Sequence, residues 1–326
     1  MSATNGRLRG GIDLGGTKIE AIVVDERHQV RGQARLPTPT EGGPADVAAA
    51  MTAAMAKAAA AAGVAPTALL GVGAGSPGTV EAASGTVTGA RNLPGWSGSY
   101  PLAAELRRRL GVPAYVGNDV AVATNAEHKL GAGKEYRSLL GVFWGTGVGG
   151  GLILDRRPWH GRGGAGEIGH MVIKRGGARC PCGRRGCVEA YAGRSAMEAR
   201  ARRALAKGRR TELFELMHER GRTRLTSSIW WHAVERGDKL AVKLVERAVK
   251  ALGAGIASAV NLLDPEAVLI GGGLGVRFGE PYVRRIAEAM RPHLFNDRTP
   301  PPVMLASLGD LGGALGAALL VPSDAA

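Results

Sequence analysis

Two glycine-rich turns, each set between apolar runs, constrain the fold of this chain more than any other feature. The first lies within Gly10–Asp25 and the second within Ser138–Leu154. In the first segment the residues after the turn are β-branched and alternate, which predicts a strand and not a helix. In the second segment an apolar run again continues after the turn. Each segment is therefore predicted to form a strand–turn–strand hairpin.

The second turn, Gly145–Gly150, matches the G-x-G-x-x-G pattern of dinucleotide-binding turns. That pattern needs a helix after the turn, so the match does not indicate a dinucleotide-binding fold here. Because the two hairpins resemble each other and lie about 130 residues apart, we expect a duplicated architecture with one hairpin in each domain. Two such turns facing across a cleft would hold a nucleotide through their backbone amides. An ordinary hairpin with a polar turn is the simpler alternative for each.

Two aspartates lie where predicted strands end. Asp13 ends the first strand and is a candidate magnesium ligand, either directly or through water. Asp119 follows the predicted strand Val112–Val116 and precedes a helix that starts at Val120. The carboxyl ends of strands are where α/β folds place their ligands, so Asp119 is a candidate catalytic carboxylate. A helix N-cap is its simpler role.

Further turns carry weaker signals. Gly271-Gly272-Gly273 follows the predicted buried strand Ala267–Ile270 and would let a ligand approach the backbone closely. Asn92, in an irregular loop, offers a donor and an acceptor that suit a sugar hydroxyl, although a turn asparagine is the simpler reading. Helices are predicted at Pro44–Gly63, Pro101–Leu110, Glu198–Arg220, Ser227–Arg236, Leu240–Leu263, Tyr282–Met290 and Asp310–Leu320.

All three cysteines of the chain, Cys180, Cys182 and Cys187, fall within eight residues, and His170 lies ten positions upstream. Three thiolates and one imidazole form a complete tetrahedral set for zinc. Because no protein ligand is missing from this set, a structural zinc site is favoured over a catalytic one. Buried cysteines with a core histidine are the alternative. The odd number of cysteines argues against a disulfide framework.

The formal net charge is +14, with 45% hydrophobic and 21% charged residues. Such a charge suits nucleic acid or an anionic substrate such as a nucleotide phosphate. Much of the excess lies on arginines of helical stretches such as Glu198–Arg210, for which a solvated helix face is favoured. No secretory signal or membrane span is recognisable, so we expect a cytoplasmic protein without membrane partners.

Five motifs together resemble the ROK family of sugar kinases, close to its bacterial glucokinases, over nearly the whole chain. They are Asp13–Lys18, Asn118-Asp119, Gly145–Gly149, Glu167–His170 and Cys180–Glu189. The last of these, with its C-x-C-G-x-x-G-C-x-E spacing, is the most specific. The loop Arg91–Trp96 also resembles the glucokinase version of the sugar-binding loop.

The resemblance implies an actin-like ATPase (ribonuclease H-like) fold with two α/β domains hinged around a cleft. We expect residues 1–118 and 307–326 to form the smaller domain. Residues 119–306, with a zinc loop at 170–189, are expected to form the larger one. The first strand is expected to begin near Arg9, which leaves no room for a DNA-binding helix-turn-helix ahead of it.

The resemblance further implies ATP-dependent phosphorylation of glucose at its 6-hydroxyl, with magnesium and structural zinc as metals. Asp119 would act as the catalytic base. Sugar hydroxyls would be held by Asn92, Asn118, Asp119, Glu167, His170 and Glu189. The nucleotide would be held by Asp13, Gly15, Gly16, Thr17, Lys18, Thr146, Gly147, Gly271, Gly272 and Gly273. Zinc would be held by His170, Cys180, Cys182 and Cys187.

The sequence also leaves open several alternatives to a glucokinase. Relatives act on mannose, fructose or N-acetylhexosamines, and some use polyphosphate as donor. A sugar-sensing transcriptional repressor is a rival of a different class, since some relatives carry this fold and the chain is basic. A zinc-stabilised binding module without catalysis is another. We expect an enzyme without a nucleic-acid partner, and the family suggests a homodimer or a tetramer.

Overall fold

The computed structural model describes residues 7–90 and 92–323, and the chain divides into two compact units. Unit 1 contains the described residues of 1–134, 158–165 and 308–326, and unit 2 contains residues 135–157 and 166–307. The sequence-based division assigned residues 119–134 to the other domain. In the structure they belong to unit 1, because the helix they form packs against the last helix of the chain.

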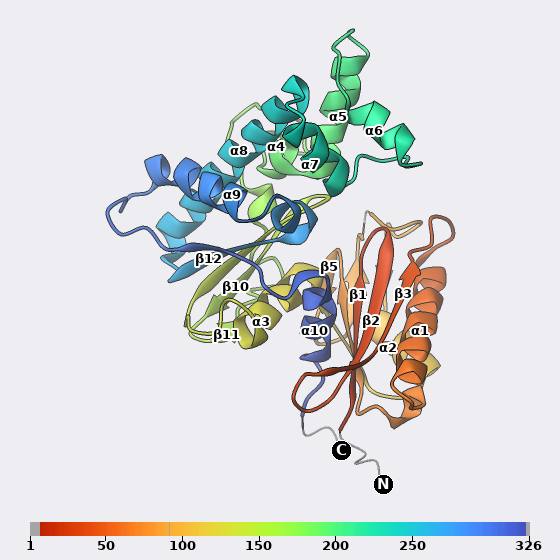
Figure 1. The fold of residues 1–326 in the computed structure, drawn as a ribbon. Coiled ribbons are helices and arrows are strands. Elements are labelled where there is room, and N and C mark those ends of the chain that lie inside the picture. Colours follow the sequence, from red (N-terminus) through yellow and green to blue (C-terminus); the bar gives the residue numbers. More distant parts are fainter. Residues whose placement is uncertain (1–6, 91, 324–326) are drawn as a thin grey trace. The chain divides into compact units, whose positions relative to one another are not determined.

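Unit 1 is built on a five-stranded sheet in the order β3-β2-β1-β4-β8 (Figure 1). β1 and β2 form the predicted antiparallel hairpin, and β4 and β8 run parallel to β1. The strands are β1 (Arg9–Leu14), β2 (Lys18–Val24), β3 (Val30–Pro37), β4 (Val72–Ser76) and β8 (Ala114–Asn118).

Alternating side chains of β2 enter two different hydrophobic cores. Ile19, Ala21 and Val23 belong to the core beneath α1 (Pro44–Ala61) and α2 (Leu102–Leu110), while Ile22 and Val24 join the core beneath α10 (Gly312–Ala318). This separation follows from the two-residue period of a strand. Helices therefore cover both faces of the sheet (Figure 1).

Close packing of α10 explains a glycine on the central strand. A Cβ atom on Gly11 would lie 2.0 Å from the carbonyl oxygen of Ala314 in α10, so no side chain fits there. α3 (Asp119–Leu130) packs against α10 and also contacts β4 and β8. The remaining elements of unit 1 are η1 (Pro66–Ala68), η4 (Gly309–Leu311) and a small sheet of β5 (Thr79–Glu81), β6 (Thr86–Thr88) and β7 (Ser99–Tyr100).

Unit 2 repeats the topology of unit 1, with the order β11-β10-β9-β12-β13. β9 and β10 form the second predicted hairpin, and β12 runs parallel to both β9 and β13. The strands are β9 (Leu139–Trp144), β10 (Val148–Leu154), β11 (Arg157–Pro158), β12 (Ala267–Gly271) and β13 (Val303–Leu305). The expected duplication is confirmed in this respect: each unit has a glycine hairpin beside two parallel strands.

The helices of unit 2 lie mostly between β11 and β12 in the chain. They are η2 (Ile168–His170), α4 (Glu189–Ala192), α5 (Arg194–Leu205), α6 (Leu213–Glu219), α7 (Ser227–Glu235), α8 (Lys239–Leu263), α9 (Gly272–Met290) and η3 (Arg291–His293). α9 begins ten residues before the predicted Tyr282, and its axis is interrupted at Gly279, where φ is 64°. Among the described helices, none is both long and apolar enough to cross a membrane.

Candidate functional site

The carboxyl ends of β1, β4 and β8 bring two predicted site residues to one edge of the unit 1 sheet. Asp13 pairs with Gly75 of β4, and Gly75 pairs with Gly117 of β8. With neighbouring strands about 4.8 Å apart, Asp13 and Gly117 are separated by about 10 Å. Asp119 follows two residues later, and a Cβ atom on Gly75 would lie 3.4 Å from its Cα. This edge therefore carries two carboxylates, one near the end of β1 and one at the start of α3, directly after β8.

Asn118 fixes the start of α3 and with it the position of Asp119. Its Oδ1 accepts hydrogen bonds of 3.1 Å from the amides of Val120 and Ala121, and its Nδ2 donates to the carbonyl of Gly78 at 3.4 Å. The N-cap is thus Asn118 and not Asp119, which is the first helical residue. The side-chain amide of Asn118 therefore has a capping role. Its predicted contact with a sugar stays a prediction.

The turn of the first hairpin is closed by a 2.9 Å hydrogen bond from the Gly15 amide to the Lys18 carbonyl. Thr38, just after β3, donates through Oγ1 to the Gly15 carbonyl at 2.6 Å. Asn92 packs against this turn, since a Cβ atom on Gly16 would lie 3.1 Å from its Nδ2. Gly16, Thr17 and Asn92 are exposed. Unit 1 thus brings Asn92 and the turn together.

Buried neighbours hold the loop that carries Asn92. Leu93 and Trp96 are buried, and Trp96 Nε1 donates to the Val87 carbonyl at 3.3 Å. The Trp96 ring also contacts Tyr100 edge-on, at a centroid distance of 5.6 Å. Arg91, the first residue of the predicted sugar loop, lies outside the described residues. The anchoring fixes Asn92 at the edge of the turn.

Two charged residues of the first hairpin, Asp13 and Lys18, have different surroundings. Burial raises the pKa of Asp13 to about 6, an effect that Lys18 opposes and that Glu20 and Asp310 reinforce. Lys18 itself lies 3.2 Å from Asp310 and 3.9 Å from the buried Glu20. Lys18, the cation predicted to meet a nucleotide, is therefore already paired with two carboxylates. Asp13 ionises less readily than an exposed aspartate, and a cation that joined it would favour its ionised form.

Glu189 supports the turn of the second hairpin. Its Oε2 accepts a 2.9 Å hydrogen bond from the Val148 amide, and a Cβ atom on Gly147 would lie 2.3 Å from the same oxygen. The turn is closed by a 3.0 Å bond from the Gly145 amide to the Gly147 carbonyl. Glu189 therefore supports the turn with one carboxylate oxygen, in addition to any role towards a ligand.

The start of α5 caps the same turn. The Arg194 and Ser195 amides donate to the carbonyls of Gly145 and Thr146 at 3.0 and 3.1 Å, and Arg194 Nη2 donates to Thr146 Oγ1 at 2.8 Å. Arg194 belongs to none of the motifs recognised in the sequence. The usable signal was a basic residue directly after Gly193, five positions beyond the carboxylate that ends the cysteine motif.

The three glycines after β12 form the entry to α9 and lie beside the second hairpin. Gly272 has φ of 80°, and a Cβ atom there would lie 2.6 Å from the Trp144 carbonyl oxygen. A Cβ atom on Gly145 would lie 3.8 Å from the Gly273 nitrogen. Unit 2 thus brings the predicted nucleotide residues Thr146, Gly147 and Gly271–Gly273 together.

The ligand atoms of His170, Cys180, Cys182 and Cys187 all lie within 4.8 Å of one another. The Cys182 and Cys187 sulfurs are 3.8 Å apart, and the Cys180 sulfur is 3.7 Å from His170 Nδ1. A tetrahedral zinc ion with 2.3 Å bonds to sulfur requires sulfurs about 3.8 Å apart, so the cluster fits zinc in both donor set and spacing. The positive φ angles of Gly183 (92°) and Gly186 (87°) let the chain turn back around the cluster.

The thiols of the metal-free cluster differ in acidity. Burial raises the pKa of Cys180 to about 12. Burial also opposes ionisation of Cys182, but hydrogen bonds from Arg184 and the neighbouring thiols outweigh it and bring its pKa to about 6. Because zinc binds thiolates, loading the site would release protons from the cluster.

The segment Glu167–His170 lies against the second hairpin. A Cβ atom on Gly169 would lie 1.9 Å from the Val148 carbonyl oxygen, so the segment approaches β10 as closely as glycine allows. His170 turns Nδ1 towards Cys180, and its Nε2 lies 3.9 Å from a carboxylate oxygen of Glu167. With Nδ1 on a metal, Nε2 would be the nitrogen available to a ligand. Val148 thus connects the metal cluster, through Glu189 and Gly169, to the turn.

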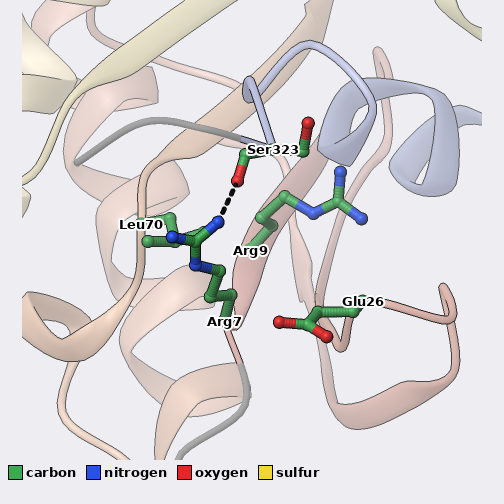
Figure 2. A pocket seen from close by; sticks show the side chains of 5 residues that line it. All are labelled: Arg7, Arg9, Glu26, Leu70 and Ser323. Atoms are coloured by element: carbon green, nitrogen blue, oxygen red, sulfur yellow. Dashed lines mark hydrogen bonds between the residues drawn. The ribbon is translucent and has the colours of Figure 1, made fainter.

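A separate cavity of about 270 Å³ in unit 1 is lined by Arg7, Arg9, Glu26, Leu70 and Ser323 (Figure 2). Arg7 Nη1 donates to the Ser323 carbonyl at 3.1 Å. Arg9 begins β1 and Asp13 lies four residues further along it, a span of about 13 Å. The cavity is therefore at the opposite end of the sheet from the two carboxylates.

Residues 9–324 match the model of the ROK family. This chain belongs to the ROK family. It is 34% identical over 312 residues to a glucokinase of Streptomyces coelicolor, covering 94% of this chain and 95% of the relative. It is also 32% identical over 319 residues to an N-acetylgalactosamine kinase of a Shewanella species, covering 95% of each.

A solved structure similar to this chain is the ROK family glucokinase of Streptomyces griseus in complex with glucose and AMPPNP. The TM-score is 0.82 at 33% sequence identity, covering 96% of this chain and 98% of the other. The fold is accordingly the actin-like ATPase fold that the sequence predicts. The ROK family member thus has the duplicated sheets of that fold, each with its glycine hairpin.

Proposed function

We propose that this ROK family protein is a glucokinase that transfers a phosphoryl group from ATP to the 6-hydroxyl of glucose. One observation carries the proposal: Asp119 is held by the Asn118 cap at the sheet edge that also carries Asp13. Phosphoryl transfer to an alcohol needs one carboxylate to accept a proton and an anionic group for the metal ion of the nucleotide. The two aspartates would supply these groups, Asp13 from β1 and Asp119 from the start of α3.

Asp119 accepts the proton of the 6-hydroxyl as the oxygen attacks the γ-phosphorus of ATP. Its backbone is fixed by the cap, and its Oδ1 is oriented by the Val120 amide at 2.9 Å. Such orientation keeps the carboxylate directed at the hydroxyl without reorganisation during the reaction. Asn92, beside the first turn, holds another hydroxyl of the sugar.

The first turn, with Thr17 exposed at its tip, binds phosphate oxygens through amides and a hydroxyl. In unit 2, Thr146 and the Gly147 amide do the same at the second turn, and the glycines at the entry to α9 allow the nucleotide to approach the backbone. Magnesium bound at Asp13 would neutralise charge on the phosphate oxygens during transfer.

Glu167, His170 and Glu189 hold the remaining sugar hydroxyls. A site that pairs its polar groups with specific hydroxyls rejects analogues that lack them. The cluster of His170, Cys180, Cys182 and Cys187 would hold zinc, which would fix the loop and the orientation of the imidazole. Glu189 links that loop to the second turn through the Val148 amide.

Glucose as the substrate is supported by the similarity to the glucokinases and by the match of the loop around Asn92 to their version of the sugar loop. The direct test is an ADP-release assay of the purified protein over glucose, mannose, fructose, N-acetylglucosamine and N-acetylgalactosamine. Each sugar is offered with ATP and with polyphosphate. A kcat/KM for glucose with ATP well above all other pairs is expected, and turnover of no hexose at all would refute the proposal.

A kinase for an N-acetylhexosamine is the second candidate. The observation in its favour is the Shewanella N-acetylgalactosamine kinase, whose 32% identity nearly equals that of the Streptomyces coelicolor glucokinase. The same panel separates the two, because a pocket shaped for glucose lacks room for an acetamido group. A higher kcat/KM for an N-acetylated sugar would replace glucose in the proposal and leave the phosphoryl transfer in place.

A further inference from the structure

We infer that Arg194 binds the phosphate chain of the nucleotide directly, as the cation of the second glycine turn. The inference rests on the proposed use of ATP and adds a charged residue to a turn that otherwise offers only amides and one hydroxyl. Arg194 is the first residue of α5 and is half-buried. Its guanidinium reaches the tip of the turn, where Nη2 donates to Thr146 Oγ1 at 2.8 Å.

The guanidinium has donors to spare. Arginine carries five N–H donors in a planar fork that matches phosphate geometry. Nη1 of Arg194 donates to the Leu225 carbonyl at 2.7 Å, and Nη2 donates to Thr146. Within residues 7–90 and 92–323 these two bonds are its side-chain hydrogen bonds, which leaves three N–H groups for a ligand.

The charge of Arg194 is not neutralised in the described part of the chain. No carboxylate oxygen there lies within 4 Å of its guanidinium, whereas nearby Glu198 pairs with Arg202 at 2.7 Å and with Arg224 at 3.3 Å. Burial lowers the pKa of Arg194, the Arg224 charge lowers it further, and Glu198 opposes both. A half-buried cation beside another cation gains most from an anion that joins it.

The hydrogen bond from Arg194 also restricts the direction of the Thr146 hydroxyl proton. Because Oγ1 accepts a hydrogen bond from Arg194, the hydroxyl proton of Thr146 points elsewhere, and Thr146 is exposed at the tip of the turn. A phosphate oxygen is a suitable acceptor for that proton. Arg194 and Thr146 then act as neighbouring donors to one anion, which is stronger when one donor is charged.

A purely structural role is the competing explanation, since Arg194 also braces the turn against α5 and residue 225. The two roles differ in their dependence on charge. Arg194→Gln removes the charge, and Arg194→Lys keeps it without the planar fork. Arg200→Gln is the matched control: Arg200 lies on the same helix, is half-buried, and donates to the Ala190 carbonyl at 2.9 Å, away from the turn.

The experiment measures ADP binding by calorimetry and adenosine binding by ligand-observed NMR for the wild-type protein and the three variants. Thermal melts show whether each variant folds. We expect Arg194→Gln to weaken ADP binding roughly 10- to 100-fold and adenosine binding less than about twofold. Arg194→Lys should recover part of the ADP affinity, and Arg200→Gln should match the wild type. In turnover assays, the KM for ATP should rise in Arg194→Gln while the KM for the sugar stays constant.

Equal losses for ADP and adenosine, or no loss for either, would overturn the inference. A wild-type protein that binds neither compound would overturn it as well. Failure of the proposed function is recognised separately, by the absence of hexose phosphorylation in the wild-type protein. A protein that phosphorylates glucose yet tolerates Arg194→Gln with an unchanged KM for ATP would refute only the role of Arg194.

Discussion

The two glycine hairpins have the same topology but differ in the charged residues beside their turns. Beside the turn of β1 and β2, Lys18 is paired with Asp310 and Glu20, and Asp13 and Asp119 share the sheet edge. Beside the turn of β9 and β10, Arg194 keeps its charge without an ion pair in the described part of the chain. Duplication thus supplied two equivalent backbone frames. We propose that different side chains adapt one of them to a metal ion and a proton, and the other to phosphate.

Removal of the proposed base in unit 1 is the strongest test of the different roles proposed for the two hairpins. Asp119→Asn should lower kcat about 10²- to 10⁴-fold, because that is the usual contribution of proton acceptance by a positioned carboxylate. Glucose binding, measured by calorimetry, should stay close to that of the wild type. The cap by Asn118 is backbone-directed and survives the change, so the fold is expected to be intact. Substantial turnover by this variant would remove Asp119 from the mechanism.

Metal removal tests how far unit 2 depends on its cluster. Stripping zinc, or the change Cys182→Ser, should raise the KM for the sugar roughly tenfold or more, or unfold the loop 170–189. Loss of the ion or of a direct ligand should cost at least as much as loss of an outer-sphere partner, which is about 10- to 100-fold. The loop can be followed by amide hydrogen exchange. Because Glu189 and Gly169 both contact Val148, exchange protection of the second turn should fall as well. Unchanged kinetics in a fully metal-free preparation would make the ion dispensable.

Local patterns in the sequence predicted the hairpins and the metal cluster. Strand alternation after Gly16 and the C-x-C spacing are encoded within a few residues, and the structure confirms both hairpins and brings the four ligands together. The site roles of Asp119, Glu167 and Asn92 stay predictions. What the sequence missed depends on long-range contacts. At the start of α9 the Trp144 carbonyl leaves no room for a side chain at Gly272, and Arg194 reaches Thr146 from 48 residues away.

The cap of α3 shows an intermediate case. A helix start near Asp119 was predicted, but either Asn118 or Asp119 could have provided the cap by residue type. The choice is made by the sheet, because Asn118 ends β8 beside Ser76 and its side chain then reaches the amides of Val120 and Ala121. The same choice leaves Asp119 as the first helical residue, at the edge it shares with Asp13.

Asp13 offers a pH test of the carboxylate edge. Its pKa is about 6 in the folded protein against a usual 3.8, so ionisation is harder in the folded state. The penalty is absent below about pH 4, grows as the pH rises, and is complete above about pH 6, where it amounts to at most about 3 kcal/mol. Asp13→Asn should therefore stabilise the metal-free protein at pH 7.5, measured by urea unfolding, while it impairs turnover.

Asp25 is the matched control for that measurement because its shift has the other sign. Burial opposes it, but hydrogen bonds from the Gln29 amide, the Arg31 guanidinium and the Arg27 amide lower the pKa of Asp25. Its ionised form stabilises the folded state above its usual pKa, so Asp25→Asn should destabilise the protein at pH 7.5. If Asp13→Asn also destabilised the protein at pH 7.5, burial would not be the cause of the raised pKa of Asp13.

The smallest expected effect separates the two hairpin cations directly. Lys18→Gln should change ADP affinity less than about threefold, because Asp310 and Glu20 already neutralise the ammonium group and an exposed ion pair is worth about 1 kcal/mol or less. The same substitution at Arg194 should weaken ADP binding at least about tenfold, since no carboxylate of residues 7–90 and 92–323 forms an ion pair with that guanidinium. Both variants belong in one calorimetric series at a single ionic strength, because screening weakens an exposed pair more than a half-buried charge. Equal losses at the two positions would mean that the hairpins grip the phosphates alike, and that the ion pairs of Lys18 open when the nucleotide binds.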